Sequence, residues 1–472
     1  MRRRWIALLI LVVMACSAGA VALVWSAARL SSLEILITPS PATPSSAQST
    51  AAIPSNSNLP SPSPPSSSFT RTPLTGTATS DLRVFDGIAR VVEGIRGLRA
   101  TGPYTRSLMT RAELQVYQEK KFKRDYTPEE ARQDSLTLAA FDLLPPDFNL
   151  WEFLLELYTN QIAGFYDPDT KQFFIISEHG RLGILEQVTF AHEYGHLLQD
   201  QHFDLVALGF TDDEKKQPKD VDDDAMLARR ALVEGDATLI QLLYLGRLSQ
   251  AEQQEWLEAV QRQPSEIFDR APRVIQEELL FPYDAGLTFV QTLYERGGWD
   301  AINAAFRDPP ASTEQILHPE KFFRRERPIR VTLPPLTDTL GSGWQLVDEN
   351  VLGEFFLRVY LEERLPTFEA EEAAAGWGGD RYAVYVNEAA GQDLLMLAVA
   401  WDDEAEAREF VDAYRSYATA RYGGDPAREE QDQALWIGKD ALWLEWRGAH
   451  VLILRGPSEE VIARVRRQIA WP

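Results

Sequence analysis

Two segments in the middle of the chain carry the apolar pattern of long helices. Residues 225–245 place their apolar side chains along one helical face, and residues 185–201 also follow a helical pattern. Upstream, Thr110 and Thr127 are each followed three positions later by glutamate, an arrangement typical of a helix start. Further helices are predicted down to about residue 325, so this part of the chain is expected to be rich in helix.

A hairpin pattern interrupts these helices. Residues 164–167 and 173–176 are rich in aromatic and apolar side chains, and a turn that begins at Pro168 separates them. The pattern predicts two paired strands, and hence a small sheet inside the helical region.

From about residue 340 the pattern changes to short apolar segments separated by turns. The predicted elements are strands 381–387, 394–401, 434–437, 442–446 and 451–454, and helices 404–422 and 458–469. This order indicates a small domain that packs helices on one face of an antiparallel sheet. The expected fold class is therefore α+β, with a helix-rich domain at 81–339 and a smaller α+β domain at 340–472.

The N-terminal residues differ from the rest in composition. Arginines at positions 2–4 precede an apolar stretch that runs to Ala28 and is long enough to cross a bilayer. Because the stretch exceeds the hydrophobic part of a cleaved signal peptide, residues 1–30 are predicted to be an uncleaved anchor with the arginines in the cytoplasm. The alternative is a lipoprotein signal that ends at Cys16. Most of residues 31–80 are Pro, Ser, Thr and Ala, which predicts a disordered linker.

Composition narrows the classes of function. The 472 residues carry a formal net charge of −23, which would repel nucleic acid and anionic membrane surfaces. Hydrophobic residues make up 45% of the chain, enough for a sizeable core. Cys16 is the single cysteine, so no intrachain disulfide can form. A nucleic-acid partner is therefore not expected.

One cluster of residues carries recognisable chemistry. Three of the six histidines lie in the short segment from His192 to His202. His192, Glu193 and His196 form an HExxH sequence. Residues four apart share one face of a helix, so both imidazoles can point at one cation while Glu193 reaches a metal-bound water. The sequence therefore predicts a zinc site with Glu193 as its general base.

A catalytic zinc usually takes a third protein ligand, and two residues compete for that role. His202 has the spacing of the extended HExxHxxGxxH motif, but Gln199 stands where that motif needs glycine to leave the helix. Glu234 is a carboxylate on an otherwise apolar helical face, where binding to a cation would relieve the cost of burying it. We favour Glu234 and expect His202 to be a local structural residue.

With these residues, the chain resembles the gluzincin-type metallopeptidases, in which a glutamate on a later helix completes the HExxH zinc site. The resemblance covers roughly residues 161–245 and implies a zincin-like fold, Zn²⁺ and hydrolysis of peptide bonds. It also implies an edge strand that pairs with an extended substrate, for which 173–176 is the candidate. Many such enzymes have aspartate four residues after the ligand glutamate, where this chain has Thr238. Asp236 is expected to point away from the metal site. The resemblance therefore does not identify the residue that would hydrogen-bond to the metal ligands.

A group that stabilises the transition state is also expected, and Tyr283 and His318 are the candidates. Together these features predict a membrane-anchored, extracytoplasmic zinc metallopeptidase that acts on polypeptides. The alternative is a catalytically inactive, peptidase-like protein of the cell envelope that serves in binding or adhesion.

Overall fold

The structure, a computed structural model, describes residues 76–160, 164–176, 182–211, 215–218, 221–263 and 265–470. The predicted anchor at 1–30 and residues 31–75 of the predicted linker lie outside these ranges. Among the described helices, none combines the length and the apolar character that crossing a bilayer requires. The first helix of the described residues, α2, begins at Gly76, within the segment predicted as linker.

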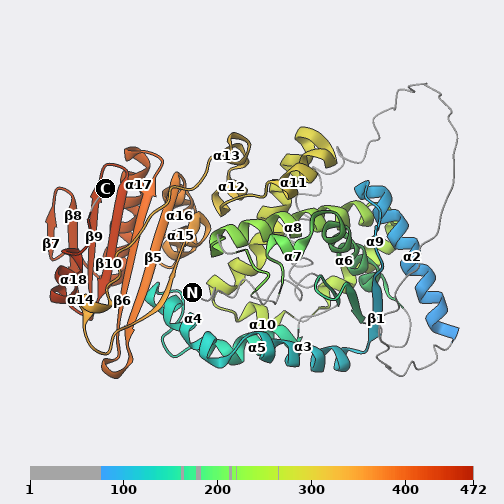
Figure 1. Ribbon diagram of the computed structural model, residues 1–472, viewed down its shortest axis with the longest axis horizontal. Helices are drawn as coiled ribbons and strands as arrows, with labels where there is room; N and C mark the ends of the chain where they lie inside the picture. Colours follow the sequence, from blue (N-terminus) through green and yellow to red (C-terminus); the bar gives the residue numbers. More distant parts are fainter. Residues whose placement is uncertain are drawn as a thin grey trace, which may run out of the picture.

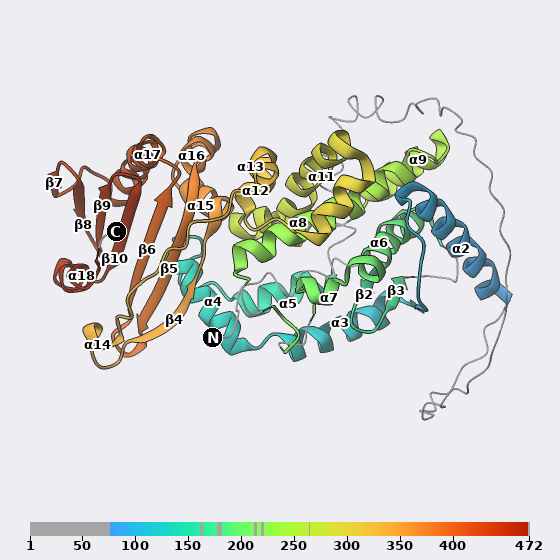
Figure 2. The same cartoon turned by 45° about the horizontal axis from the view of Figure 1, so that its top comes forward.

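The α+β class is confirmed. A helical region with a small mixed sheet comes first, and a domain built on a seven-stranded antiparallel sheet follows it. Figures 1 and 2 show the two parts at opposite ends of an elongated molecule. The elements of the helical region are α2 (Gly76–Arg96), β1 (Thr105–Met109), α3 (Arg111–Asp125), α4 (Pro128–Ala140), α5 (Leu150–Asn160), β2 (Gly164–Asp167), β3 (Gln172–Ile176), α6 (Ile184–Phe203), α7 (Leu205–Leu208), α8 (Asp223–Leu245), α9 (Gln250–Gln261), α10 (Glu266–Asp269), α11 (Arg273–Arg307), α12 (Thr313–Leu317) and α13 (Pro319–Arg324).

Both predicted capping boxes are present. At the start of α3, the Thr110 hydroxyl accepts a hydrogen bond from the Glu113 backbone N–H, and the Glu113 carboxylate accepts one from the Thr110 N–H. Thr127 and Glu130 repeat the arrangement at the start of α4. These bonds satisfy N–H groups that the first turn of a helix leaves without a partner, so sequence alone fixes where the two helices begin.

The predicted hairpin forms, but its second strand lies at the centre of the small sheet. β3 pairs antiparallel with β2 on one side and parallel with β1 on the other. Residues 173–176 are buried. The expectation that this strand offers a free edge to a substrate is therefore wrong, because neighbouring strands occupy both of its edges. The edge strand next to α6 is β2, whose Tyr166 N–H points to Glu193.

Glycines let helix α8 approach its two neighbours closely. A Cβ atom at Gly235 would lie 2.2 Å from the backbone oxygen of Gly286 on α11, and one at Gly286 would lie 2.2 Å from the oxygen of Ala231. On the side of α6, a Cβ at Gly195 would come within 3.6 Å of the Ala237 backbone. The position of α8 between α6 and α11 therefore depends on glycine, which has no side chain, at positions 195, 235 and 286.

The substitution Gly286→Ala is expected to lower the free energy of unfolding by about 1–3 kcal/mol, because α8 and α11 must separate to make room for the methyl group. Gly94→Ala is the matched control, since a Cβ there meets nothing within 4 Å on the exposed side of α2. It should leave stability unchanged or raise it by up to about 1 kcal/mol. Urea denaturation measures both. Equal midpoints for the two variants would contradict the close contact.

The C-terminal domain follows the helical region, and its first helix is α14. Its sheet has the strand order β4-β5-β6-β10-β9-β8-β7. Its elements are α14 (Thr337–Leu340), β4 (Gln345–Asn350), α15 (Gly353–Glu362), α16 (Thr367–Ala374), β5 (Trp377–Asn387), η4 (Glu388–Ala390), β6 (Gln392–Trp401), α17 (Glu404–Tyr422), β7 (Arg428–Glu430), β8 (Gln433–Ile437), β9 (Ala441–Arg447), β10 (His450–Gly456) and α18 (Glu459–Arg466). The five predicted strands and two predicted helices are present, and β4 and β7 are additional.

Both faces of this sheet are covered, so the expectation of helices on one face is wrong. Alternate residues of β5 point to opposite sides: Tyr382 and Val384 belong to the main core shared with α15 and α17, whereas Ala383 and Tyr385 belong to a second cluster. That second cluster also contains residues of α14 and α18. The short α18 carries only two buried apolar positions, but these are enough to close the far face.

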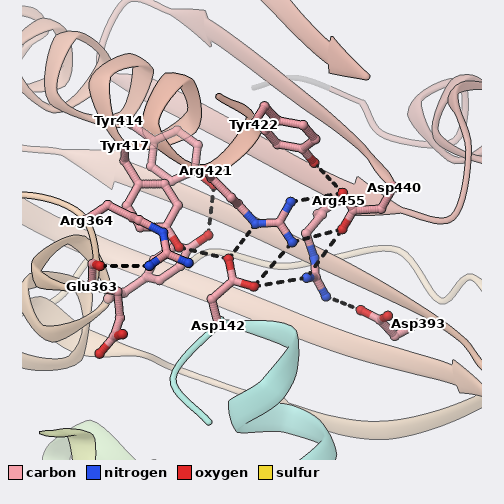
Figure 3. A network of polar contacts seen from close by, with 11 residues as sticks. Asp142, Glu363, Arg364, Asp393, Tyr414, Tyr417, Arg421, Tyr422, Asp440 and Arg455 are labelled. Atoms are coloured by element: carbon pink, nitrogen blue, oxygen red, sulfur yellow. Dashed lines mark hydrogen bonds and ion pairs between the residues drawn. The ribbon is translucent and has the colours of Figure 1, made fainter. Parts of the chain in front are cut away.

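A network of partly buried charges joins the two parts of the chain (Figure 3). Asp142 follows α4 in the helical region, and its carboxylate accepts hydrogen bonds from Arg421 at 2.6 Å and from Tyr417 at 3.0 Å, both on α17. Arg455 on β10 lies 3.5 Å from the same carboxylate. Asp440 pairs with Arg421 from the other side. The loop after α4 is thus fixed to the C-terminal sheet by alternating charges.

The acidic loop before α8 forms part of the same junction. Three aspartates, at positions 222–224, stand where this loop enters α8. Asp222 caps α8, but Asp223 and Asp224 are buried in its first turn. Asp223 accepts a hydrogen bond from the Asn350 side chain at 2.6 Å, and Asp224 accepts one from the Thr313 hydroxyl at 2.5 Å. Contacts with later parts of the chain therefore hold the start of α8.

Asp142→Asn is expected to lower the free energy of unfolding by about 1–3 kcal/mol, because two arginines lose a carboxylate they share. Asparagine keeps the side-chain size and tolerates the left-handed backbone at this position, where φ is 57°. Asp147→Asn in the same loop is the control, since Asp147 is exposed and should be neutral. Thermal or urea unfolding compares the two; a neutral Asp142→Asn would show that the junction does not depend on this charge.

Candidate metal centre

Helix α6 carries the HExxH residues on a regular, buried stretch. His192, Glu193 and His196 are 0%, 2% and 7% exposed. The helix continues without a break through Gln199 and ends at Phe203, where Asp204 adopts a left-handed conformation. Because the helix is intact, the two histidines lie one turn apart on the same side, as the spacing predicts.

Helix α8 brings Glu234 to this side of α6. Its Oε2 lies 3.2 Å from His192 Nε2 and 3.5 Å from His196 Nε2, and the two imidazole nitrogens are 3.1 Å apart. Glu234 is only 1% exposed. Three potential ligand atoms from two helices therefore converge on one point inside the protein.

This geometry fits a metal ion. Ligands about 2.0–2.1 Å from a tetrahedral ion are about 3.3 Å from one another, which matches the three observed separations. Two imidazoles and one carboxylate are a ligand set used by catalytic zinc. A single cation would also offset the charge of a carboxylate that is buried beside two imidazoles. The buried His192, His196 and Glu234 can thus hold a metal ion.

The charges of the site are strongly coupled. Burial opposes ionisation of Glu234, but the two imidazoles outweigh it and lower the pKa of Glu234 to about 2. Burial likewise opposes protonation of His196, yet the Glu234 carboxylate raises the pKa of His196 to about 9. Burial dominates at His192 and lowers its pKa. These directions describe the protein groups alone, and they leave a carboxylate at the centre that attracts positive charge.

Glu193 is held beside the site with one oxygen left over. Its Oε2 accepts a hydrogen bond of 2.8 Å from the Tyr166 N–H at the edge of β2. Its Oε1 is buried and has no hydrogen-bond partner in the described part of the chain. Burial raises the pKa of Glu193 to about 8. A carboxyl group with a fixed orientation, a free oxygen and a pKa near neutrality suits proton transfer.

Two glutamines orient the imidazoles, and neither was identified from the sequence. Gln241 on α8 lies 3.2 Å from His192 Nδ1, and Gln199 on α6 lies 2.9 Å from His196 Nδ1. When each amide oxygen accepts the Nδ1 proton, the Nε2 atom is left free to bind a metal. Hydrogen bonds of this kind set the tautomer and orientation of metal-binding histidines. The helical spacing in the sequence could have identified both glutamines. Gln241 lies seven residues after Glu234 and Gln199 lies three residues after His196, so each glutamine shares a helical face with a metal ligand.

The hydrogen bonds continue outward to α2. The Gln199 amide donates to Asp236 at 3.0 Å, and Asp236 forms an ion pair of 3.0 Å with Arg96. The Arg96 guanidinium stacks over the Trp299 ring at 4.6 Å. Asp236 was expected to point elsewhere, but it faces α6 and supports His196 through Gln199. Thr238 occupies the position where aspartate was expected, and its buried hydroxyl has no hydrogen-bond partner among the described residues.

The remaining candidates lie at different places. His202 is exposed in the last turn of α6, and its Nε2 lies 2.8 Å from the Arg99 carbonyl oxygen, so it is not part of the cluster. Tyr283 on α11 is buried, with its ring 6.3 Å from the ring of His192. His318 lies between α12 and α13 and contacts Glu354 of α15 at 2.8 Å. Of the two proposed stabilising groups, Tyr283 is the one that borders the cluster.

A second group of acidic residues has a different explanation. Glu314, Glu326 and Asp402 also lie close enough together to suggest a metal site. Lys321 already contacts all three carboxylates. The Lys321 ammonium group supplies the positive charge, so this cluster is an ion-pair network between α12, α13 and the C-terminal sheet.

Comparison with known proteins bears on the C-terminal domain. Residues 343–466 match a family described as a domain of unknown function (DUF8575), from just before β4 to the end of α18. No peptidase family matches the chain. No curated protein and no solved structure matches it significantly either.

Glu234→Ala is expected to abolish stoichiometric metal binding, because only two imidazoles would remain. His202→Ala should retain the metal, since the His202 ring is bonded to a backbone carbonyl away from the cluster. Elemental analysis after dialysis against zinc measures both. Loss of metal in His202→Ala together with its retention in Glu234→Ala would contradict the site and favour the extended histidine motif.

Proposed function

We propose that this protein is a zinc-dependent peptidase of the gluzincin type. The observation that carries the proposal is the convergence of His192, His196 and Glu234 within 3.5 Å, with the Glu193 carboxylate beside them. A metal site alone would need only the three ligands. The Glu193 carboxylate in addition leaves one buried oxygen free, and hydrolysis requires such a proton acceptor.

The chain's own residues provide most of the mechanism. His192, His196 and Glu234 would hold the ion, with Gln241 and Gln199 keeping the imidazoles in the binding tautomer. Bound zinc lowers the pKa of water and polarises a carbonyl group. Glu193 Oε1 accepts the proton of the attacking water and delivers it to the leaving amine, while the Tyr166 N–H prevents the carboxyl group from rotating.

Tyr283 is the best placed residue to stabilise the negative charge that develops on the carbonyl oxygen. Its ring borders that of His192, whereas His318 is engaged by Glu354. A phenol that donates a hydrogen bond to the oxyanion typically contributes a substantial part of transition-state stabilisation. We therefore assign this role to Tyr283 and a structural role to His318.

The proposed setting follows from the sequence of the first 80 residues. A membrane anchor at 1–30 and a linker would place the catalytic region outside the cytoplasm, where it would meet extracytoplasmic polypeptides. The net charge of −23 also argues against nucleic acid as a partner.

Glu193→Gln is expected to retain about one zinc ion per chain and to lose peptidase activity by about 10²–10⁴-fold, because the proton acceptor is gone while the ligands remain. Glu186→Gln is the control: the same substitution on the same helix, two turns before the motif. Zinc content and hydrolysis of an unfolded, fluorescently labelled polypeptide are measured together. Full activity in Glu193→Gln would refute its role, and zinc binding without hydrolysis of any polypeptide by the unmodified protein would favour the binding or adhesion alternative.

A further inference from the structure

Arg230 is a buried cation without a bonded partner. It lies on α8, one turn before Glu234, and is 3% exposed. Its Nε and Nη2 atoms have no hydrogen-bond partner among the described residues, and no ion pair is found for it there. The other two buried arginines differ: Arg96 pairs with Asp236, and Arg455 lies among carboxylates of the domain junction. Of the three buried arginines in the described part of the chain, Arg230 is the one without a hydrogen-bonded or ion-paired partner.

The guanidinium lies on the metal-facing side of α8. Arg230, Glu234 and Gln241 are four and seven residues apart, which places them on one helical face, and the last two contact His192. Burial lowers the pKa of Arg230, and the nearby carboxylates of Glu278 and Glu234 oppose that effect. Arg230 thus shares the space next to the cluster with a metal ligand and with Tyr283.

Glu278 on α11 does not neutralise Arg230 directly. It is itself 2% exposed and makes no hydrogen bond or ion pair in the described part of the chain. An arginine buried without a close anion loses its hydration and gains little in return. Arginine also offers a planar set of N–H groups that matches a carboxylate in a two-point contact. The missing partner is therefore an anion that a ligand can supply.

We propose that Arg230 binds a carboxylate of the substrate within about two residues of the bond that is cleaved. Four residues of helix advance about 6 Å, and an extended peptide advances about 3.3 Å per residue, so a carbonyl group at the metal and a carboxylate at Arg230 would be separated by about two residues. This inference rests on the proposed peptidase function. It names the substrate class: peptides that end near the cleaved bond, or peptides with an acidic side chain there.

The test compares three short acetylated peptides that differ in one group. The first has a free C-terminal carboxylate, the second ends in an amide, and the third ends in an amide but carries glutamate as its last residue. Each is titrated by calorimetry against the full chain in detergent, loaded with zinc and carrying Glu193→Gln so that no peptide is consumed. The same titrations are run with Arg230→Met and Arg230→Lys added, and Arg229→Met is the matched control, since Arg229 bonds the Leu208 carbonyl oxygen at 2.9 Å.

The free carboxylate, or the glutamate peptide, should bind about 10- to 100-fold more tightly than the neutral amide. Arg230→Met should remove that preference while zinc content stays at one per chain, Arg230→Lys should restore part of it, and Arg229→Met should leave it unchanged. Which of the two acidic peptides binds tells whether the carboxylate is a chain end or a side chain. Equal binding of all three peptides would overturn the role of Arg230, even if the unmodified protein is an active peptidase.

Failure of the proposed function has a separate signature. If the protein binds no zinc and hydrolyses nothing, the carboxylate site is tested by itself with glutarate, a small dicarboxylate, in a thermal unfolding assay. Stabilisation of the unmodified protein but not of Arg230→Met would support the anion site without the peptidase. No stabilisation of either would overturn it.

Discussion

The contact between α6 and α8 is the feature on which the rest of the molecule depends. It puts a carboxylate oxygen within 3.2–3.5 Å of two imidazole nitrogens among buried residues. Three such groups without a cation would be costly to bury, since their lone pairs face one another and their hydration is lost. A metal ion turns the same arrangement into a favourable one. Glu193, Gln199 and Gln241 acquire their roles from this centre.

Backbone packing makes that contact possible. α8 meets α11 through Gly235 and Gly286, where no room exists for a methyl group, and it meets α6 at Gly195. Between the helices, the hydrogen bonds run from His196 through Gln199 and Asp236 to the buried Arg96. Such a polar chain is stable in the interior only when its members find partners, which links the orientation of one imidazole to helix α2.

The C-terminal domain bears on the same helix from the other end. The buried Asp223 in the first turn of α8 accepts a hydrogen bond from Asn350 of β4, and Asp142 joins the helical region to Arg421 of α17. The match to the family of unknown function covers this domain. Through Asn350, the domain contacts the start of the helix that carries Arg230 and Glu234 farther along.

Local patterns in the sequence determined much of this protein. Capping boxes fixed where α3 and α4 begin, alternation marked five strands of the C-terminal sheet, and the i, i+4 spacing on one helix put two histidines on a common face. Each of these depends on neighbours within a few residues, so no tertiary information is needed. Tertiary structure decided what depends on distant segments: the central place of β3 in its sheet, the helices on both faces of the C-terminal sheet, and the glutamines at the imidazoles. Glu234 stands 38 residues after His196, and only the packing of α8 against α6 and α11 brings it to the centre, because the distance between two helices is set by the side chains between them.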